Sequence, residues 1–219
     1  MDLFTLAAPI FDLAMEISGH NKVLVELGDR IKKDELKNYS KGGQQLDFAS
    51  SGDNKAEKKA PELLDLGGGT GELVKHLPKN LNVTVADPSE AMLTKGKKKK
   101  FEQPVEHVLA DGADLPFADK SFDYLVISDA LHHFQQVKAA LNESARVLKP
   151  GGKMYILEFD PETFFTKAII FFEKLAGEPV NFYKPEVLAS FLDQDNLEIN
   201  YEYLNKSLYI MCIQKKIML

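Results

Sequence analysis

The stretch LLDLGGGTGEL, residues 63–73, places an acidic residue and four glycines between an apolar run and a polar one. Glycines this close together lose much backbone entropy on folding, so a compensating requirement is expected. Backbone without Cβ atoms can approach a ligand closely, and the binding crevice of an open α/β sheet lies at the carboxyl ends of its strands. We therefore expect one wall of a ligand site at Asp65, Gly67, Gly68 and Gly69. A tight strand-to-helix turn without a ligand is the alternative.

The residues after this loop argue against a phosphate-bearing ligand. A P-loop requires a Lys-Ser or Lys-Thr pair after the glycines, but Gly71 is followed by Glu72 and Leu73. A dinucleotide site requires a third glycine at the position of Glu72, so a nicotinamide cofactor is the weaker alternative. The Glu72 carboxylate would also repel a pyrophosphate. The loop therefore favours a ligand without phosphates.

Two further acidic residues follow the next two apolar runs. Asp87 ends the run VAD about twenty residues after the loop, where a carboxylate can accept hydrogen bonds from two ribose hydroxyls. Asp87 and Ser89 also form a good start for a helix, and both interpretations can hold together. Asp111 follows the third run, where it could accept a hydrogen bond from an adenine amino group. These spacings predict an adenosine-like ligand.

The segment SDALHHF, residues 128–134, carries the side chains best suited to acid–base chemistry. If a substrate must lose a proton during the reaction, a general base is required, and a histidine side chain titrates in the right pH range. We take His133 and Asp129 as the catalytic candidates. Capping, packing or solvent exposure of the two histidines is the alternative interpretation. No spacing of histidines and carboxylates indicates a metal site, so no metal is predicted.

Short apolar runs alternate with amphipathic stretches from Glu62 onward, a pattern typical of an α/β fold with a parallel sheet. Strands are predicted at residues 63–66, 82–86, 105–110, 124–128 and 153–158. Helices are predicted to start near Gly71, Ser89 and Gln135, with two more in FFTKAIIFFEKLAG and KPEVLASFLDQDN. The remaining residues predict two strands joined around Asn205. We expect a Rossmann-like, doubly wound sheet of mostly parallel strands that ends in an antiparallel hairpin.

The first sixty residues differ from the rest. Apolar residues recur at helical spacing up to Ile17, interrupted by Pro9, and a polar, lysine-rich segment follows with a further helix expected to reach Leu36. We expect residues 1–60 to form N-terminal helices and a mobile lid segment, and residues 61–219 to form the ligand-binding domain, the whole being one structural domain.

Composition excludes several classes of protein. The 219 residues carry a formal net charge of −6 with 44% apolar residues, which argues against a dedicated nucleic-acid binder. The single cysteine, Cys212, excludes an intrachain disulfide framework, so we expect a cytoplasmic protein. No apolar run is long enough for a transmembrane segment. A nucleic-acid substrate is therefore not expected, and the oligomeric state is left open.

Four blocks in register resemble the class I S-adenosylmethionine (SAM)-dependent methyltransferases: LLDLGGGTGEL, VADPSEAML, ADGADLPFADKSFDYLVISDALHHF and ARVLKPGGKMYILEF. The resemblance covers about residues 62–160. The segments RVLKPGGKMYILEFDP and APIFDLAM are most similar to the subgroup of ubiquinone/menaquinone C-methyltransferases. After Asp160 we find no match to the later motifs of that subgroup, so the resemblance leaves the acceptor open.

The resemblance implies SAM as the cofactor and assigns its contacts. Asp65 would face the amino-acid part, Asp87 would hold the ribose hydroxyls, and Ser128 would pass beneath the methionine. The adenine and the remaining cradle would be held by Asp111, Gly112 and Ala113, together with Gly67, Gly68 and Gly69. His133 is similar in position to an active-site histidine of phosphoethanolamine methyltransferases, and Asp129 would orient a substrate cation or the cofactor.

We therefore expect SAM-dependent methyl transfer to a small molecule, with quinones, lipids and amine-like metabolites as the acceptors considered. A protein of another class, a SAM-binding sensor or partner subunit without catalysis, is the alternative, because the sequence contains no unambiguous catalytic residue.

Overall fold

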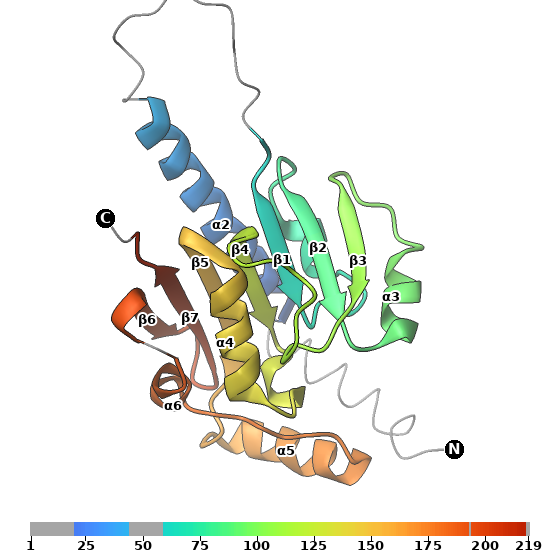
Figure 1. The fold of residues 1–219 in the computed structure, drawn as a ribbon. Coiled ribbons are helices and arrows are strands. Elements are labelled where there is room, and N and C mark those ends of the chain that lie inside the picture. The colour runs from blue at the N-terminus through green and yellow to red at the C-terminus, as the bar shows by residue number, and fades with distance from the viewer. Residues whose placement is uncertain (1–19, 44–58, 193, 218–219) are drawn as a thin grey trace, which may run out of the picture.

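The computed structural model describes residues 20–43, 59–192 and 194–217, and a seven-stranded sheet forms its centre (Figure 1). The strands are β1 (Glu62–Leu66), β2 (Asn82–Asp87), β3 (Val105–Leu109), β4 (Phe122–Ser128), β5 (Leu148–Phe159), β6 (Leu197–Tyr203) and β7 (Leu208–Lys215). Their order across the sheet is β3-β2-β1-β4-β5-β7-β6. The first five run parallel, and β7 pairs antiparallel with both β5 and β6. The predicted fold class is confirmed.

β5 begins earlier than predicted. Leu148 pairs with Phe122 and Lys153 with Tyr124, so an irregularity in register separates the two pairs. Lys149, Pro150 and the two following glycines lie within that irregularity, and their poor strand propensity explains the shorter prediction. The other parallel strands lie within one or two residues of their expected bounds.

The described helices cover both faces of the sheet. They are α2 (His20–Gly43), α3 (Glu90–Gly96), α4 (Val137–Val147), α5 (Phe164–Ala176) and α6 (Pro185–Ser190), with 3-10 turns η1 (Leu73–His76), η2 (Leu131–His133) and η3 (Gln194–Asn196). In Figure 1, α4 lies on one face, α2 on the opposite face, and α5 crosses below the carboxyl ends of the parallel strands. Ser89 caps α3 as expected, since its Oγ accepts a hydrogen bond from the amide of Met92 at 3.3 Å.

The helix expected near Gly71 is only the 3-10 turn η1. Leu77, which ends it, is extended because the following Pro78 disfavours helical geometry at the preceding residue. β2 then begins at Asn82, which leaves no length for a longer helix. α2 covers this face of the sheet instead, and a side chain at Gly28 would overlap the carbonyl oxygen of His76.

α2 continues to Gly43, beyond the expected end at Leu36. The helices expected in residues 1–18, and residues 44–58 of the expected lid segment, lie outside the described residues. The described part of α2 packs on the core through Val23, Leu24, Leu27 and Ile31. Polar contacts fix it further along: Asp34 accepts a hydrogen bond from Lys153 Nζ at 2.6 Å, and Glu35 accepts one from the Tyr124 hydroxyl at 2.7 Å.

Alternate residues of the strands supply two apolar clusters, one on each face of the sheet. Leu64 and Leu66 of β1 belong to the cluster that includes Leu141 of α4, whereas Leu63 belongs to the cluster that includes Leu27 of α2. This three-layer arrangement fixes the strands rigidly and leaves their carboxyl ends to carry polar groups.

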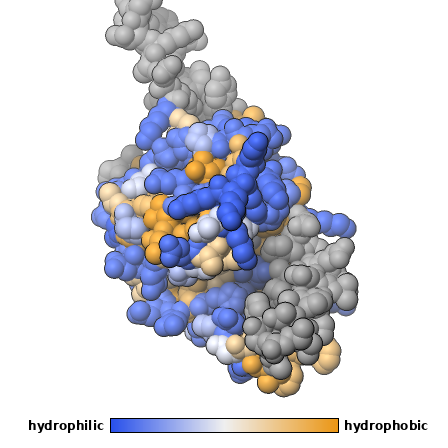
Figure 2. Space-filling view, turned by 90° about the vertical axis from the view of Figure 1, so that its right-hand side faces the viewer, coloured by the Kyte–Doolittle hydropathy of each residue, from blue (hydrophilic) through white to orange (hydrophobic). Residues whose placement is uncertain are grey.

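The outer surface at one edge of the sheet is mixed in polarity. The edge formed by β3 and α3 is mostly hydrophilic, with apolar patches between (Figure 2). None of the described helices combines the length and the apolar composition needed to cross a bilayer.

We predict that Leu27→Ala destabilises the protein, because the Leu27 side chain is fully buried between α2 and the sheet. The free energy of unfolding, measured by urea titration, should fall by about 2–5 kcal/mol. The exposed Lys33 on the same helix gives the control variant Lys33→Ala, for which a change within about 0.5 kcal/mol is expected. Equal midpoints for both variants would contradict the packing of α2 on the core.

Candidate active site

The carboxyl ends of β1, β2 and β4 bring the expected site residues to one edge of the sheet. Asp65 pairs in register with Val85 of β2 on one side and with Val126 of β4 on the other. The glycine loop that follows contacts the end of β2 directly, since the amide of Gly69 donates a hydrogen bond to Asp87 Oδ2 at 2.9 Å. The first two predicted blocks therefore meet in space as expected.

The glycine loop is fixed by the protein's own backbone. Gly67 and Gly69 adopt positive φ values of 73° and 55°. The amide of Gly67 donates to the carbonyl oxygen of Ala86 at 2.7 Å, and the amide of Gly69 is used by Asp87. Two of the amides that were expected to line a ligand thus hold the loop against β2.

Packing explains two of these glycines without a ligand. A Cβ at Gly67 would lie 2.6 Å from the Ala130 Cβ, and a Cβ at Gly68 would lie 2.5 Å from Asp65 Oδ2. At Gly69 the nearest atom is the methyl group of Met92 at 3.3 Å, a group at the end of a flexible side chain. Gly69 is therefore the loop glycine whose open side faces Met92 and Asp87.

Asp87 is held in a fixed orientation. It is buried, and its Oδ1 accepts a hydrogen bond from the amide of Ser89 at 2.8 Å while Oδ2 accepts from Gly69. Each carboxylate oxygen has a second lone pair, so this carboxylate can still accept hydrogen bonds from two hydroxyl groups of a ligand.

Within the described part of the chain, Asp65, unlike Asp87, keeps an unsatisfied carboxylate oxygen. Its side chain is buried, and its Oδ2 has no hydrogen-bond partner among the described residues. Burial, and then the charge of Asp87, raise the pKa of Asp65 to about 7. Two neighbouring carboxylates, one of them unpaired, suit a ligand that carries positive charge.

The residues directly after β3 are the next group that the sequence predicts to contact the cofactor. Asp111 is exposed, and its Oδ1 accepts a hydrogen bond from the amide of Ala113 at 2.9 Å. Gly112 lies against the Phe134 ring, because a Cβ there would be 2.6 Å from a ring carbon. Met92, on the first turn of α3, is 39% exposed. Its side chain offers an apolar surface on which a flat ring could lie.

The end of β4 carries the remaining expected residues. Ser128 Oγ is buried without a hydrogen-bond partner among the described residues. Asp129 has a strained backbone with φ of 52°. Burial raises the pKa of Asp129 to about 7, where the charge of His132 opposes the shift and the charges of Glu158 and Glu173 add to it.

The two histidines of η2 have different surroundings. His133 is exposed, whereas His132 is buried with its Nδ1 2.9 Å from Glu158 Oε2. Burial by itself lowers the pKa of His132, but the charge and hydrogen bond of Glu158, together with Glu173 and Asp129, raise it well above its ordinary value. His132, Glu158 and Glu173 were not among the expected site residues. An acid at the end of an apolar strand could have indicated Glu158, but no local signal marks Glu173.

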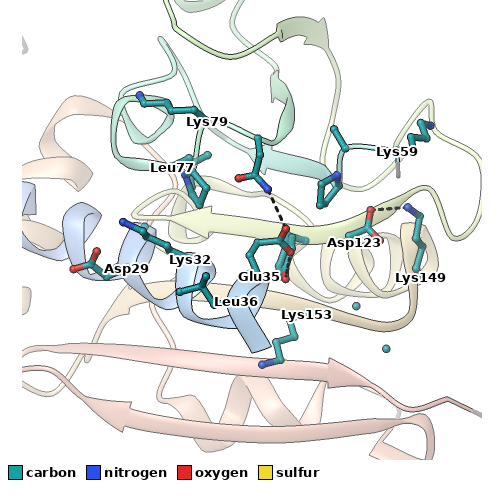
Figure 3. Close-up of a pocket in the computed structure, with 18 of the residues that line it drawn as sticks. Asp29, Lys32, Glu35, Leu36, Lys59, Leu77, Lys79, Asp123, Lys149 and Lys153 are labelled. Carbon is teal, nitrogen blue, oxygen red and sulfur yellow. Dashed lines mark hydrogen bonds and ion pairs between the residues drawn. The ribbon is translucent and has the colours of Figure 1, made fainter. Parts of the chain in front are cut away.

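A separate cavity of about 1140 Å³ lies at the opposite end of the sheet, between α2 and the amino ends of the strands (Figure 3). Charged side chains of both signs line it: Lys32, Glu35, Lys79, Asp123 and Lys149. Asn80 donates to Glu35 at 3.3 Å, and Lys149 pairs with Asp123 at 2.6 Å. It contains none of the expected site residues, so size alone does not identify the active site.

Comparisons with known proteins place this arrangement among methyltransferases. The methyltransferase-domain family model matches residues 64–156. The ubiquinone/menaquinone biosynthesis C-methyltransferase UbiE of Roseobacter denitrificans is 31% identical over 72% of this chain and 74% of its own length. The demethylmenaquinone methyltransferase of Renibacterium salmoninarum is 32% identical over 67% of this chain and 70% of its own length. The UbiE proteins of Cereibacter sphaeroides and Paracoccus denitrificans match this chain over 44% of their own length.

A solved SAM-dependent methyltransferase from Aquifex aeolicus has the same fold. It is 19% identical and matches with a TM-score of 0.56 over 72% of this chain and 84% of its own. At that identity the likeness concerns the fold alone.

We predict that Asp65→Asn stabilises the protein more at pH 8 than at pH 5. Asp65 titrates near 4 in the unfolded chain and at about 7 in the fold, so its contribution to stability falls as pH rises through this interval. The substitution removes that loss, and the gain in unfolding free energy should be about 2–3 kcal/mol larger at pH 8. Urea titrations at both pH values provide the measurement.

The exposed Asp114 supplies the matched control, and Asp114→Asn should leave the pH dependence unchanged. A gain for Asp65→Asn that is equal at both pH values would show that Asp65 is already ionised at pH 5.

Proposed function

The chain belongs to the class I SAM-dependent methyltransferases, and from this we propose that it methylates a ring carbon of a quinol, with the cofactor held between Asp65 and Asp87. The observation that carries the proposal is the pair of relatives above 30% identity over two thirds of the chain or more, one named for ubiquinone and menaquinone biosynthesis and the other for demethylmenaquinone. The cradle at the ends of β1 and β2 supports the cofactor half.

The residues present fit this cofactor. SAM carries an ammonium and a sulfonium group, and the unpaired, buried Asp65 carboxylate suits such positive charge. Asp87 would accept hydrogen bonds from the ribose hydroxyls. The adenine would lie between Met92 and the loop of Asp111, Gly112 and Ala113, and Ser128 would pass beneath the methionine. Gly67 and Gly68 would support the cradle from within.

Bound SAM supplies a methyl group on positively charged sulfur, ready for in-line displacement. The protein's own task is then to align the acceptor with this group and to exclude water. Because the methyl group leaves as an electrophile, the acceptor carbon must be electron-rich, as the ring of an ionised quinol is. His133 and Asp129, at the carboxyl end of β4, are our candidates for polar groups that contact the acceptor.

Asp87→Ala should weaken SAM binding by about 1–3 kcal/mol, the range for leaving buried polar partners unpaired. Isothermal titration with SAM and with its demethylated product measures the effect. Glu106→Ala, an exposed position on β3 away from the proposed cradle, is the control and should bind as the unmodified protein does. Unchanged affinity in Asp87→Ala would place the ribose elsewhere.

A direct assay tests the acceptor. The full chain is incubated with SAM and either a reduced demethylmenaquinone analogue or phosphoethanolamine, and the products are analysed by mass spectrometry. We expect one methyl group on a ring carbon of the quinol and none on the amine. Methylation of the amine alone would overturn the proposed substrate class but not the methyltransferase assignment.

His133→Ala should lower the turnover of the quinol at least tenfold and leave the affinity for SAM within about twofold, because His133 lies beside the acceptor side of the site rather than in the cradle. Lys138→Ala, an exposed position at the start of α4, is the control. Loss of SAM binding in His133→Ala would contradict this separation.

A further inference from the structure

We propose that His132, His133 and Glu173 form a binding site for a divalent transition-metal ion, with zinc as the ion that fits best. The histidines belong to η2, directly after β4, and Glu173 belongs to α5, which crosses below the carboxyl ends of the strands (Figure 1). One ligand atom from each of the three residues lies within 4.8 Å of the others.

The contact between His132 and Glu173 has the spacing of two ligands of one ion. His132 Nε2 lies 3.5 Å from Glu173 Oε1, which is long for a charge-assisted hydrogen bond. Two ligand atoms bound tetrahedrally at about 2.0–2.2 Å from a zinc ion are separated by about this distance. The pair is therefore arranged to share an ion without a large rearrangement.

Glu158 supports this arrangement from the other side of the His132 ring. His132 Nδ1 lies 2.9 Å from Glu158 Oε2, and the same carboxylate accepts hydrogen bonds from the amides of His132 at 3.1 Å and Phe159 at 2.8 Å. A carboxylate bound to one ring nitrogen fixes the tautomer that presents the other nitrogen to a metal. The Phe182 ring stacks on His132 with 4.1 Å between centroids and holds its plane.

The burial of the Glu173 carboxylate is the observation that favours a bound cation here. Its side chain is 7% exposed, and neither of its carboxylate oxygens has a hydrogen-bond partner among the described residues. Its ion-pair partner His132 lies 3.5 Å from Oε1, too far for a good hydrogen bond, so this buried carboxylate is only partly compensated and a bound metal ion would satisfy it. One of its oxygens lies within 4.8 Å of a ring nitrogen of each histidine.

A second set, Asp129, His132 and Glu158, also has ligand atoms within 4.8 Å of one another. Both oxygens of Glu158 are already occupied by hydrogen bonds, whereas those of Glu173 are not. We therefore assign the ion to the Glu173 side, with Glu158 holding His132 and Asp129 adding negative charge nearby.

The donor set selects the kind of ion. Two imidazole nitrogens and one carboxylate suit zinc and its neighbours, whereas magnesium and calcium prefer oxygen ligands alone. The exposed His133 gives the ion a path from solvent, and three protein ligands leave a fourth position open. An ion here would make His133 a ligand, so His133 would act on the acceptor through the ion.

Metal binding can be measured without SAM or acceptor. The full chain, stripped with a chelator, is titrated with Co²⁺ by visible absorption and with Zn²⁺ by calorimetry. We expect one ion per chain, with absorption bands typical of a four-coordinate Co²⁺ site. His133→Ala and Glu173→Gln should each weaken binding at least tenfold, and Glu158→Gln about 10–100-fold.

The controls are His76→Ala, a histidine of η1 outside this cluster, and Glu90→Gln, an exposed acid of α3, both of which should bind as the unmodified chain does. His133→Ala removes an exposed side chain, so it tests the site even if Glu173→Gln unfolds, which circular dichroism would reveal. Absence of Co²⁺ binding in the micromolar range, or binding unchanged in His133→Ala, would overturn the proposal.

Discussion

Buried negative charge at the carboxyl edge of the sheet is the constraint on which the rest of the structure depends. Parallel strands bring their carboxyl ends to one edge, and among the described residues several acids lie there or directly over it, including Asp65, Asp87, Asp129, Glu158 and Glu173. Such charges are tolerated in a fold only when partners compensate them. The two proposed ligands, a sulfonium cofactor and a divalent ion, each supply positive charge to one part of this edge.

The two parts of the edge differ in how far the protein itself satisfies them. Asp87 and Glu158 each accept backbone hydrogen bonds through both oxygens, so they are held as rigid supports. Asp65 and Glu173 each keep at least one buried oxygen without a hydrogen-bond partner among the described residues. Each site thus combines one fixed carboxylate with one that is left for a ligand. This division of roles is typical of preorganised sites, in which the supporting groups are satisfied before the ligand arrives.

The fold and the chemistry are specified by different parts of the chain. The glycine loop, β1 and β2 form the proposed cradle, and they belong to a fold that a solved structure of low identity shares. The proposed acceptor side contains η2 and α5, and the matched family segment, residues 64–156, includes η2 but not α5. The proposed quinol substrate therefore rests on the relatives named for quinones and not on the family model.

Local sequence determined the strands, the closing hairpin, the α3 cap at Ser89 and the meeting of Gly69 with Asp87, because alternation, capping and strand-end positions are short-range properties. Long-range packing decided the rest. Gly67 is required by Ala130, Gly28 lets α2 approach the carbonyl oxygen of His76, and Glu173 reaches His132 only because α5 folds back across the strand ends. No periodicity encodes such contacts, since they join residues far apart in the chain. The tertiary structure alone therefore revealed that Glu173 lies beside His132, opposite Glu158.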